Sequence, residues 1–151
     1  MSDKNIHFSS ATDQWATPQD TFDKLNKIFN FETDVCADQH NTKCENFYTE
    51  SDNGLLQEWR GVCWMNPPYG RGIGDWLKKA YDSCKENNAT VVCLIPARTD
   101  TRWWHDYCVH GEVFLLKGRL KFGDAKNCAP FPSAIVVFRP KISDLFEGFQ
   151  A

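Results

Sequence analysis

The stretch Cys63-Trp64-Met65-Asn66-Pro67-Pro68-Tyr69-Gly70 decides how the rest of the sequence is interpreted. The apolar run 62–65 is typical of a short buried strand, and a helical pattern begins a few residues after the stretch ends. In open α/β sheets, ligands bind at the loops that follow the carboxyl ends of strands. We therefore expect residues 66–69 to form a binding loop.

The four residues of this loop suit the binding of a planar amine. The side-chain carbonyl of Asn66 accepts a hydrogen bond, while its amide group can donate elsewhere. Pro67 and Pro68 have a fixed φ and no N–H, so the loop is stiff and its carbonyl groups are free to point outward. Tyr69 offers a flat ring on which a base can stack.

Five short blocks, taken in order along the chain, match the pattern of a known family. They are Trp15-Ala16-Thr17-Pro18, Asp34-Val35-Cys36-Ala37, residues 64–69, residues 94–104 and Gly118-Arg119-Leu120-Lys121-Phe122. In this order the blocks resemble the compact phage Dam-type DNA N-6-adenine methyltransferases, whose catalytic motif is Asn-Pro-Pro-Tyr. The resemblance covers about residues 15–139. It implies an enzyme that transfers a methyl group from S-adenosylmethionine to the N6 amino group of adenine in DNA, after the adenine has flipped out of the duplex.

The same resemblance implies roles for individual residues. The catalytic residues that it implies are Asn66, Pro67, Pro68 and Tyr69. The cofactor-binding residues that it implies are Trp15, Thr17, Pro18, Asp34, Cys36, Ala37, Asp52 and Asn66. Structural explanations compete at two of these positions, because a Trp outside a helix often packs in the core and Asp52 can cap a short helix. Most methyltransferases also have a glycine-rich turn where this chain has Ala37-Asp38-Gln39-His40.

Positive charge is concentrated in the carboxyl-terminal half of the chain. The net charge of −3 argues against coating nucleic acid by charge alone, yet residues 98–139 hold seven cations and four acids. The predicted nucleic-acid contacts are Tyr69, Arg71, Arg98, Arg102, Arg119 and Lys121. The long connection 118–132 is the candidate surface for DNA, although a solvated loop explains its composition equally well.

The bulk composition predicts one domain in a soluble cytoplasmic protein. We expect an arm at residues 1–13, a methyltransferase domain at 14–140 and a peripheral tail at 141–151. No apolar run is long enough to cross a membrane, and no signal-peptide core is apparent. The family resemblance implies a phage or prophage protein. Seven scattered cysteines indicate reduced thiols, and Cys36, His40 and Cys44 lack a fourth ligand, so no metal is predicted.

Alternating strand and helix patterns predict a compact, Rossmann-like, three-layer αβα fold with a mainly parallel sheet and an antiparallel strand at its end. The polar segment 41–53 is too short for the strands and helix that usually precede the catalytic loop, so the middle of the fold should be reduced. The expected helices begin at residues 17–18, 75 and 103. The expected strands are 31–37, 62–65, 90–95, 112–116 and 133–138.

The predicted chemistry depends on two acceptors. The side-chain oxygen of Asn66 and the backbone carbonyl of Pro67 would accept from the two hydrogens of an amino group and expose its lone pair to the methyl donor. The same loop would serve N4-cytosine, guanine in RNA or the side chain of a protein glutamine. A non-catalytic nucleic-acid-binding protein on a reduced methyltransferase fold is the other alternative, because the glycine turn is missing and the middle section is short.

Overall fold

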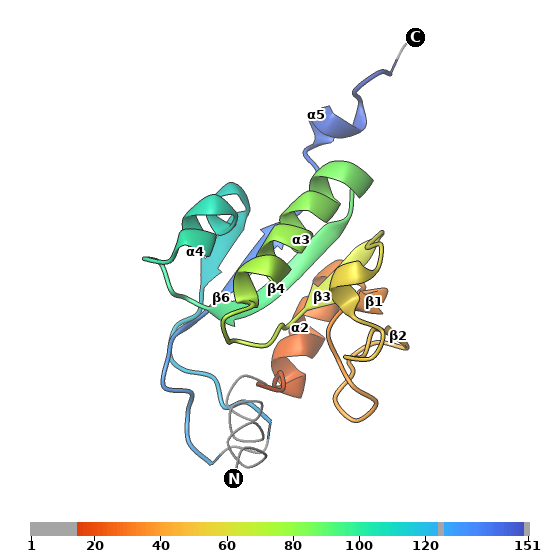
Figure 1. Ribbon diagram of the computed structural model, residues 1–151. Coiled ribbons are helices and arrows are strands. Elements are labelled where there is room, and N and C mark those ends of the chain that lie inside the picture. The colour runs from red at the N-terminus through yellow and green to blue at the C-terminus, as the bar shows by residue number, and fades with distance from the viewer. Residues whose placement is uncertain (1–14, 124–125, 150–151) are drawn as a thin grey trace.

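The computed structural model describes residues 15–123 and 126–149, which form a six-stranded sheet with helices packed on it (Figure 1). The strands are β1 (Thr33–Asp34), β2 (Asn46–Phe47), β3 (Val62–Met65), β4 (Thr90–Pro96), β5 (Glu112–Leu115) and β6 (Ser133–Phe138). The α-helices are α2 (Gln19–Phe29), α3 (Ile73–Asn87), α4 (Arg102–Asp106) and α5 (Ile142–Leu145). Two short 3₁₀ helices, η1 (Gly54–Leu56) and η2 (Cys108–His110), complete the described elements.

The sheet is mixed, with parallel pairing on one side and antiparallel pairing on the other. Its strand order is β2-β1-β3-β4-β6-β5. The pairs among β2, β1, β3 and β4 are parallel, whereas β6 runs antiparallel to both β4 and β5. The prediction of a mainly parallel sheet that ends in antiparallel pairing is therefore confirmed.

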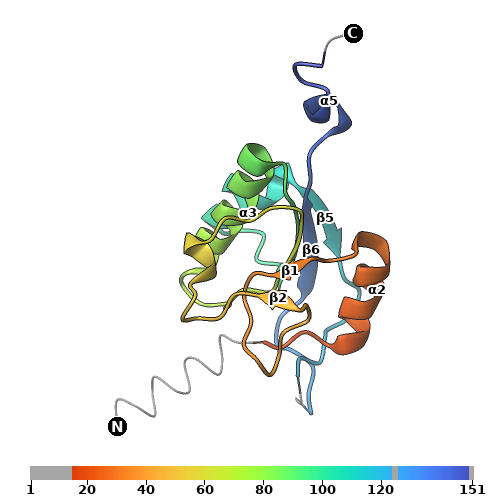
Figure 2. The ribbon, with the colours of Figure 1, turned by 90° about the vertical axis from the view of Figure 1, so that its right-hand side faces the viewer.

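Helices cover both faces of this sheet. Figure 2 shows α2 against one face, with α3 on the opposite face. Helix α3 also packs against α4 and η1, which places these elements on its side of the sheet. This is the three-layer αβα arrangement that the alternating pattern predicts.

The core lies along β4 and β6, which are neighbours in the sheet and each have a strand on both sides. Every residue of β6 is buried, and so is every residue of β4 after Thr90. Such strands have helices or other strands on both faces, so their sequences are continuous apolar runs instead of alternating patterns. Burying each Val, Leu or Ile side chain contributes roughly 1.5–3 kcal/mol. This apolar run therefore fixes β4 in the middle of the sheet.

The middle section is reduced, as the short segment 41–53 predicts. Between β1 and β3 the described chain forms only the two-residue strand β2 and the 3₁₀ turn η1. Strand β1 itself is two residues long, much shorter than the predicted 31–37. Side-chain hydrogen bonds replace the missing ladder: the Asp38 carboxylate accepts from the backbone N–H of His40 at 2.7 Å and of Asn41 at 2.8 Å.

Three helix boundaries differ from the predicted ones. Helix α2 begins at Gln19 with Pro18 at its N-cap, and the Thr17 hydroxyl accepts from the Asn66 side chain and does not cap the helix. Helix α3 begins at Ile73, two residues ahead of the predicted Asp75. Helix α4 starts one residue early, after a cap from the Thr101 hydroxyl, and the chain then tightens into η2.

The remaining predictions concern the ends of the chain and its cysteines. The predicted arm 1–13 lies outside the described residues. Within the described ranges, no helix has the length and apolar character needed to cross a membrane. All seven cysteines are free thiols, and Cys63, Cys93 and Cys108 are buried. Beyond β6, Ile142 and Phe149 in the tail are strongly exposed.

Replacing Gly54 by Ala tests how tightly η1 is seated on β1. A Cβ at Gly54 would lie 2.2 Å from the backbone oxygen of Val35, which real structures do not tolerate. We expect Gly54→Ala to reduce the free energy of unfolding by about 1–3 kcal/mol, measured by urea denaturation. The control is Gly72→Ala, where a Cβ meets nothing within 4 Å. Equal effects of the two substitutions would contradict this account of the packing.

Candidate active site

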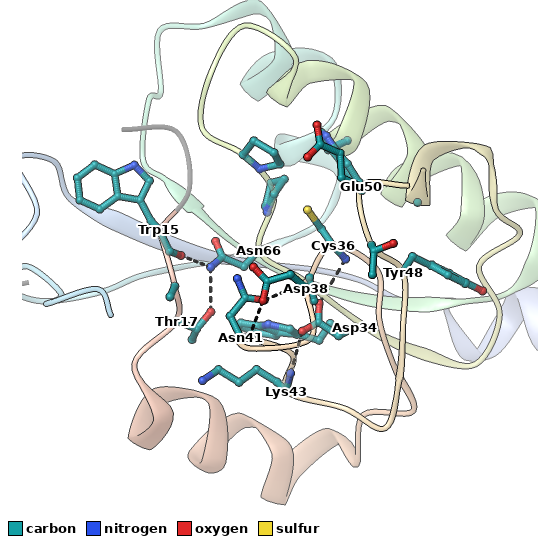
Figure 3. Close-up of a pocket in the computed structure, with 18 of the residues that line it drawn as sticks. Trp15, Thr17, Asp34, Cys36, Asp38, Asn41, Lys43, Tyr48, Glu50 and Asn66 are labelled. Carbon is teal, nitrogen blue, oxygen red and sulfur yellow. Dashed lines mark hydrogen bonds between the residues drawn. The ribbon is translucent and has the colours of Figure 1, made fainter. Parts of the chain in front are cut away.

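A cavity of about 740 Å³ opens at the carboxyl ends of β1 and β3 (Figure 3). Parallel strands end at the same edge of a sheet, so the segment after Asp34 and the loop after Met65 face one another there. The other walls come from the chain ahead of α2, from the polar loop before η1 and from the side of Trp76. The cavity is thus built mainly from the predicted blocks 15–18, 34–37 and 64–69.

The side-chain amide of Asn66 has a fixed orientation at this edge. Its Nδ2 donates to the backbone carbonyl of Trp15 and, at 2.9 Å, to the Thr17 hydroxyl (Figure 3). A carbonyl can only accept, so the nitrogen and not the oxygen of the amide must face Trp15. The Oδ1 atom of Asn66 is left buried without a hydrogen-bond partner in the described part of the chain. A buried polar atom of this kind is an acceptor available to a ligand.

Asp34 organises the opposite wall. Its carboxylate accepts from the backbone N–H of Cys36 at 3.3 Å and of Lys43 at 3.0 Å, which ties both ends of the 36–43 loop to β1. Burial raises the pKa of Asp34 to about 7, against the opposing effects of these two hydrogen bonds and the Lys43 charge. This carboxyl group and the Asp38 carboxylate organise the loop at the position where the sequence has no glycine-rich turn.

Tyr69 is buried instead of facing the cavity. Only 3% of the residue is exposed, and its hydroxyl donates to the backbone carbonyl of Leu94 at 2.9 Å. Two rings are in T-shaped contact with it, with centroid distances of 6.1 Å to Phe122 and 5.6 Å to Phe131. Burial also raises the pKa of the Tyr69 hydroxyl well above its ordinary value. The predicted stacking of a base on this ring stays a prediction, and it requires these two rings to move.

The other predicted cofactor-binding residues divide into two groups. Those that line the cavity are Trp15, Thr17, Asp34, Cys36, Ala37 and Asn66, together with the loop prolines Pro67 and Pro68. Pro18 and Asp52 do not line it. Pro18 is the N-cap of α2, and the exposed Asp52 carboxylate accepts from the backbone N–H and the hydroxyl of Thr49. Asp52 does not cap the short helix η1 either, because the N-cap is Asn53, whose side chain accepts from the backbone N–H of Leu55.

Several cavity residues were missed by the sequence reasoning. They are Asn41, Lys43, Tyr48, Glu50, Asn53 and Trp76. For Asn53 the sequence held a signal, because it is an amide residue directly before Gly54 and Leu55. In the structure its φ of 53° lies in the left-handed region, which favours Asn. Glu50 and Tyr48 lie in a polar loop with no periodicity, so only the folded chain brings them to the cavity.

The cations predicted to contact nucleic acid lie on exposed loops and helix ends near the loop 66–69. Arg71, Arg98, Arg102, Arg119 and Lys121 are all exposed. One of them touches the loop directly: Arg98 donates to the backbone carbonyl of Tyr69 at 3.3 Å, and its guanidinium lies 6.0 Å from the ring centre of Phe131. Their contact with DNA stays a prediction.

A metal site would need three or more suitable ligands close together. No such group of His, Cys, Asp or Glu side chains exists in the ranges that the structure describes. Burial raises the pKa of Cys36 to about 12 and that of Cys44 to about 11, which keeps both as neutral thiols.

The sheet, the cavity at its carboxyl edge and the stiff polar loop beside it define a compact, methyltransferase-like α/β protein. Comparison with known proteins gives the family. The model of the family described as DNA N-6-adenine-methyltransferase (Dam) matches residues 5–144, and the chain belongs to that family. The resemblance stated from the five sequence blocks is confirmed.

Two phage proteins are similar to the chain. The DNA N-6-adenine-methyltransferase of Haemophilus phage HP1 is 35% identical over 152 residues, which cover 93% of this chain and 87% of that protein. The DNA N-6-adenine-methyltransferase of Escherichia phage T1 is 33% identical over 96 residues, which cover 61% of this chain and 39% of that longer protein.

The raised pKa of Asp34 predicts a pH dependence of stability. The folded protein keeps the Asp34 proton up to about pH 7, whereas an unfolded chain releases it near pH 4. Stability should therefore fall as pH rises from about 4 to 7, by up to about 4 kcal/mol from this group. Urea denaturation at several pH values measures how the free energy of unfolding changes with pH. In Asp34→Asn the fall in stability due to this group should be absent. The exposed Asp75→Asn serves as control, and an unchanged slope in Asp34→Asn would contradict the assignment.

Proposed function

We propose that this protein transfers the methyl group of S-adenosylmethionine to the N6 amino group of an adenine in DNA. The observation that carries the proposal is the unpartnered Oδ1 of Asn66, held by two hydrogen bonds on the opposite side of the amide at the edge of a ligand-sized cavity. The family to which the chain belongs and the names of its phage relatives support the choice of DNA adenine as substrate.

The size and charge of the cavity fit the proposed methyl donor. Ligand pockets usually measure about 300–1,000 Å³, and this cavity lies within that range. Its lining holds Asp38, Glu50 and Lys43, besides Asp34, whose pKa burial raises to about 7, so acids outnumber cations even when Asp34 is left out. Such a lining favours a ligand that carries positive charge, as the sulfonium and ammonium groups of S-adenosylmethionine do. The polar side chains of Glu50 and Asn53 are suited to the hydroxyl and amino groups of its nucleoside.

The chain's own contribution to the reaction is to hold and polarise the amino group. The lone pair of the adenine amino group is delocalised into the ring, which makes the nitrogen a poor nucleophile. When Asn66 Oδ1 and the Pro67 carbonyl accept its two hydrogens, the lone pair is directed away from both acceptors. The bound donor supplies an electrophilic methyl group on that side.

The two acceptors matter most in the transition state, when positive charge develops on the nitrogen. Bound in the cavity, S-adenosylmethionine would supply the methyl group and leave as the neutral thioether, and the methylated amino group would lose one proton to water. Thr17 and the Trp15 carbonyl act through Asn66, because they fix the amide before the substrate arrives and no reorientation is needed during the reaction.

The loop by itself would accept any planar amine, including N4 of cytosine, guanine in RNA or a glutamine side chain. The family match favours adenine in DNA over these acceptors. A ligand-sized cavity next to a free acceptor likewise favours an enzyme over a non-catalytic binding protein.

Removing the Asn66 acceptor tests the proposal directly. We expect Asn66→Ala to lower kcat by at least about 100-fold, as the loss of one preorganised polar group in an active site does. Affinity for S-adenosylmethionine should change far less, because the cavity keeps its other walls. Transfer of labelled methyl groups to DNA and calorimetric titration of the cofactor measure the two effects, and mass spectrometry of digested nucleosides identifies the methylated base.

The control for this substitution is Asn46→Ala, at an exposed position on β2. It should leave turnover close to wild type. A rate near wild type for Asn66→Ala would overturn the proposed role of Asn66. N4-methylcytosine in place of N6-methyladenine in the product would overturn the proposed substrate alone.

Substitutions at Thr17 test whether the orientation of the Asn66 amide matters separately from the direct contact of Asn66 with the substrate. Thr17→Val keeps the shape of the side chain and removes the acceptor for Asn66 Nδ2. We expect kcat to fall about tenfold, the effect of losing one hydrogen bond of about 1–1.5 kcal/mol, while the KM for DNA stays unchanged. Thr17→Ser keeps the hydroxyl and should retain most of kcat. If Thr17→Ser lost as much activity as Thr17→Val, packing of the methyl group and not the hydrogen bond would be responsible.

A further inference from the structure

We propose that Phe122 and Phe131 form an aromatic latch that closes the base-binding side of the active site when no DNA is bound. The latch is carried by the connection between β5 and β6, and it must open before an adenine can reach Tyr69 and Asn66. The inference rests on the proposed function and concerns how its substrate gains access.

The latch is part of a four-ring cluster that joins three distant segments of the chain. Phe122 and Phe131 come from the β5–β6 connection, Tyr69 from the loop after β3, and Trp15 from the segment ahead of α2. The centroid of Trp15 lies 5.5 Å from that of Phe122 and 5.2 Å from that of Phe131, both in edge-on contact. These distances are those of favourable aromatic pairs. The two Phe rings therefore hold the connection against both Trp15 and Tyr69.

This arrangement blocks access to the two groups that a base would contact, the Tyr69 ring and Asn66 Oδ1. The ring of Tyr69 is in T-shaped contact with Phe122 and Phe131, and only 3% of the residue is exposed, so a base has no open face on which to stack. Asn66 Oδ1 is also buried, so neither the stacking ring nor the acceptor is accessible from solvent. The adjoining cofactor cavity is open. The closed side is thus the substrate side alone, and a base can enter only if something moves.

Few backbone hydrogen bonds fasten the β5–β6 connection to the rest of the chain. Besides its two ends, one backbone hydrogen bond fastens its described residues to the rest of the chain, from the N–H of Gly123 to the carbonyl of Ala16 at 2.8 Å. A second, from Ala129 to Leu120 at 2.8 Å, closes the connection on itself. Arg98 adds the contact of its guanidinium with Phe131. The latch is therefore held mainly by aromatic packing.

The charge of the connection suits opening by DNA. Lys117, Arg119, Lys121 and Lys126 are exposed, and none forms a salt bridge with another residue in the described ranges. Phosphates would attract these cations, and the rings that share the connection would move with them. The Ala16 carbonyl that anchors Gly123 lies between Trp15 and Thr17, the two residues that hold the Asn66 amide. Opening would therefore act next to the acceptor as well as at Tyr69.

A reversible disulfide can lock the latch. A Cβ at Gly123 would lie 3.5 Å from the Cβ of Ala16, which falls within the range of disulfide-bonded cysteines. The test protein is Ala16→Cys/Gly123→Cys in a Cys128→Ser background, because Cys128 is the exposed cysteine of the same connection. Gly123 has φ of +53°, which strains a Cys there, so the reduced double variant is the reference for the oxidised one. Each single cysteine variant under the same oxidant controls for oxidation elsewhere.

We expect the oxidised double variant to lose at least about tenfold of its methylation rate on unmethylated genomic DNA, because the open state is no longer populated. Its affinity for S-adenosylmethionine should stay within about twofold of the reduced form, and dithiothreitol should restore the rate. Equal rates for the oxidised and reduced forms would overturn the latch and leave the proposed function intact. Loss of cofactor binding on oxidation would also overturn it, because the lock would then act through the cofactor cavity. If the wild-type protein does not methylate DNA, the proposed function fails first.

A second measurement on the unmodified protein covers the case in which the reduced double variant is itself inactive. Hydrogen exchange followed by mass spectrometry reports the Gly123 N–H, which donates to Ala16 in the closed state. Saturating DNA should make this amide exchange faster. Slower or unchanged exchange would contradict the opening of the latch.

Discussion

The site depends on one constraint, the pair of hydrogen bonds that the Asn66 amide donates to the Trp15 carbonyl and the Thr17 hydroxyl. These bonds span about fifty residues of sequence and bring the start of the chain to the loop after β3. They decide which atom of the amide faces the substrate, because a carbonyl has no hydrogen to donate. In the same segment Pro18 is the N-cap of α2, and no side chain caps the helix.

Side chains organise the loop beside the cavity. Asp34 and Asp38 accept from backbone N–H groups of the 36–43 loop, where the sequence has no glycine-rich turn. The compact design has an energetic consequence, because the buried Asp34 keeps its proton to about pH 7. A bound sulfonium ligand would favour the ionised form of this carboxyl group, so cofactor affinity and protonation are linked at this position. The substrate side depends on aromatic packing instead: exposing the buried ring of Phe122 costs roughly 1.5–3 kcal/mol, which contacts with DNA can supply.

The sequence predictions were most accurate for elements set by local patterns and least accurate where contacts between distant segments set the structure. Continuous apolar runs located β3, β4 and β6 almost to the residue, because burial on both faces is written directly into composition. The β1 strand and the start of α3 were less well located, since side-chain hydrogen bonds and contacts from distant segments set their ends. Asp52 and Asn53 show the same limit at the site. Adjacent polar residues in a tight turn point in different directions, and only the folded chain places Asn53 at the cavity and Asp52 on the surface.

The sequence by itself determined the class of the fold, the strand that carries the loop 66–69 and the residue types that can hold an amine there. These follow from local patterns, namely apolar periodicity, two consecutive prolines and one amide side chain. Tertiary structure decided which oxygen is free, which loop supplies the acidic lining of the cavity and that Phe122 and Phe131 cover Tyr69. Each of these depends on contacts between residues far apart in the chain, whose distances are fixed only when the sheet has formed.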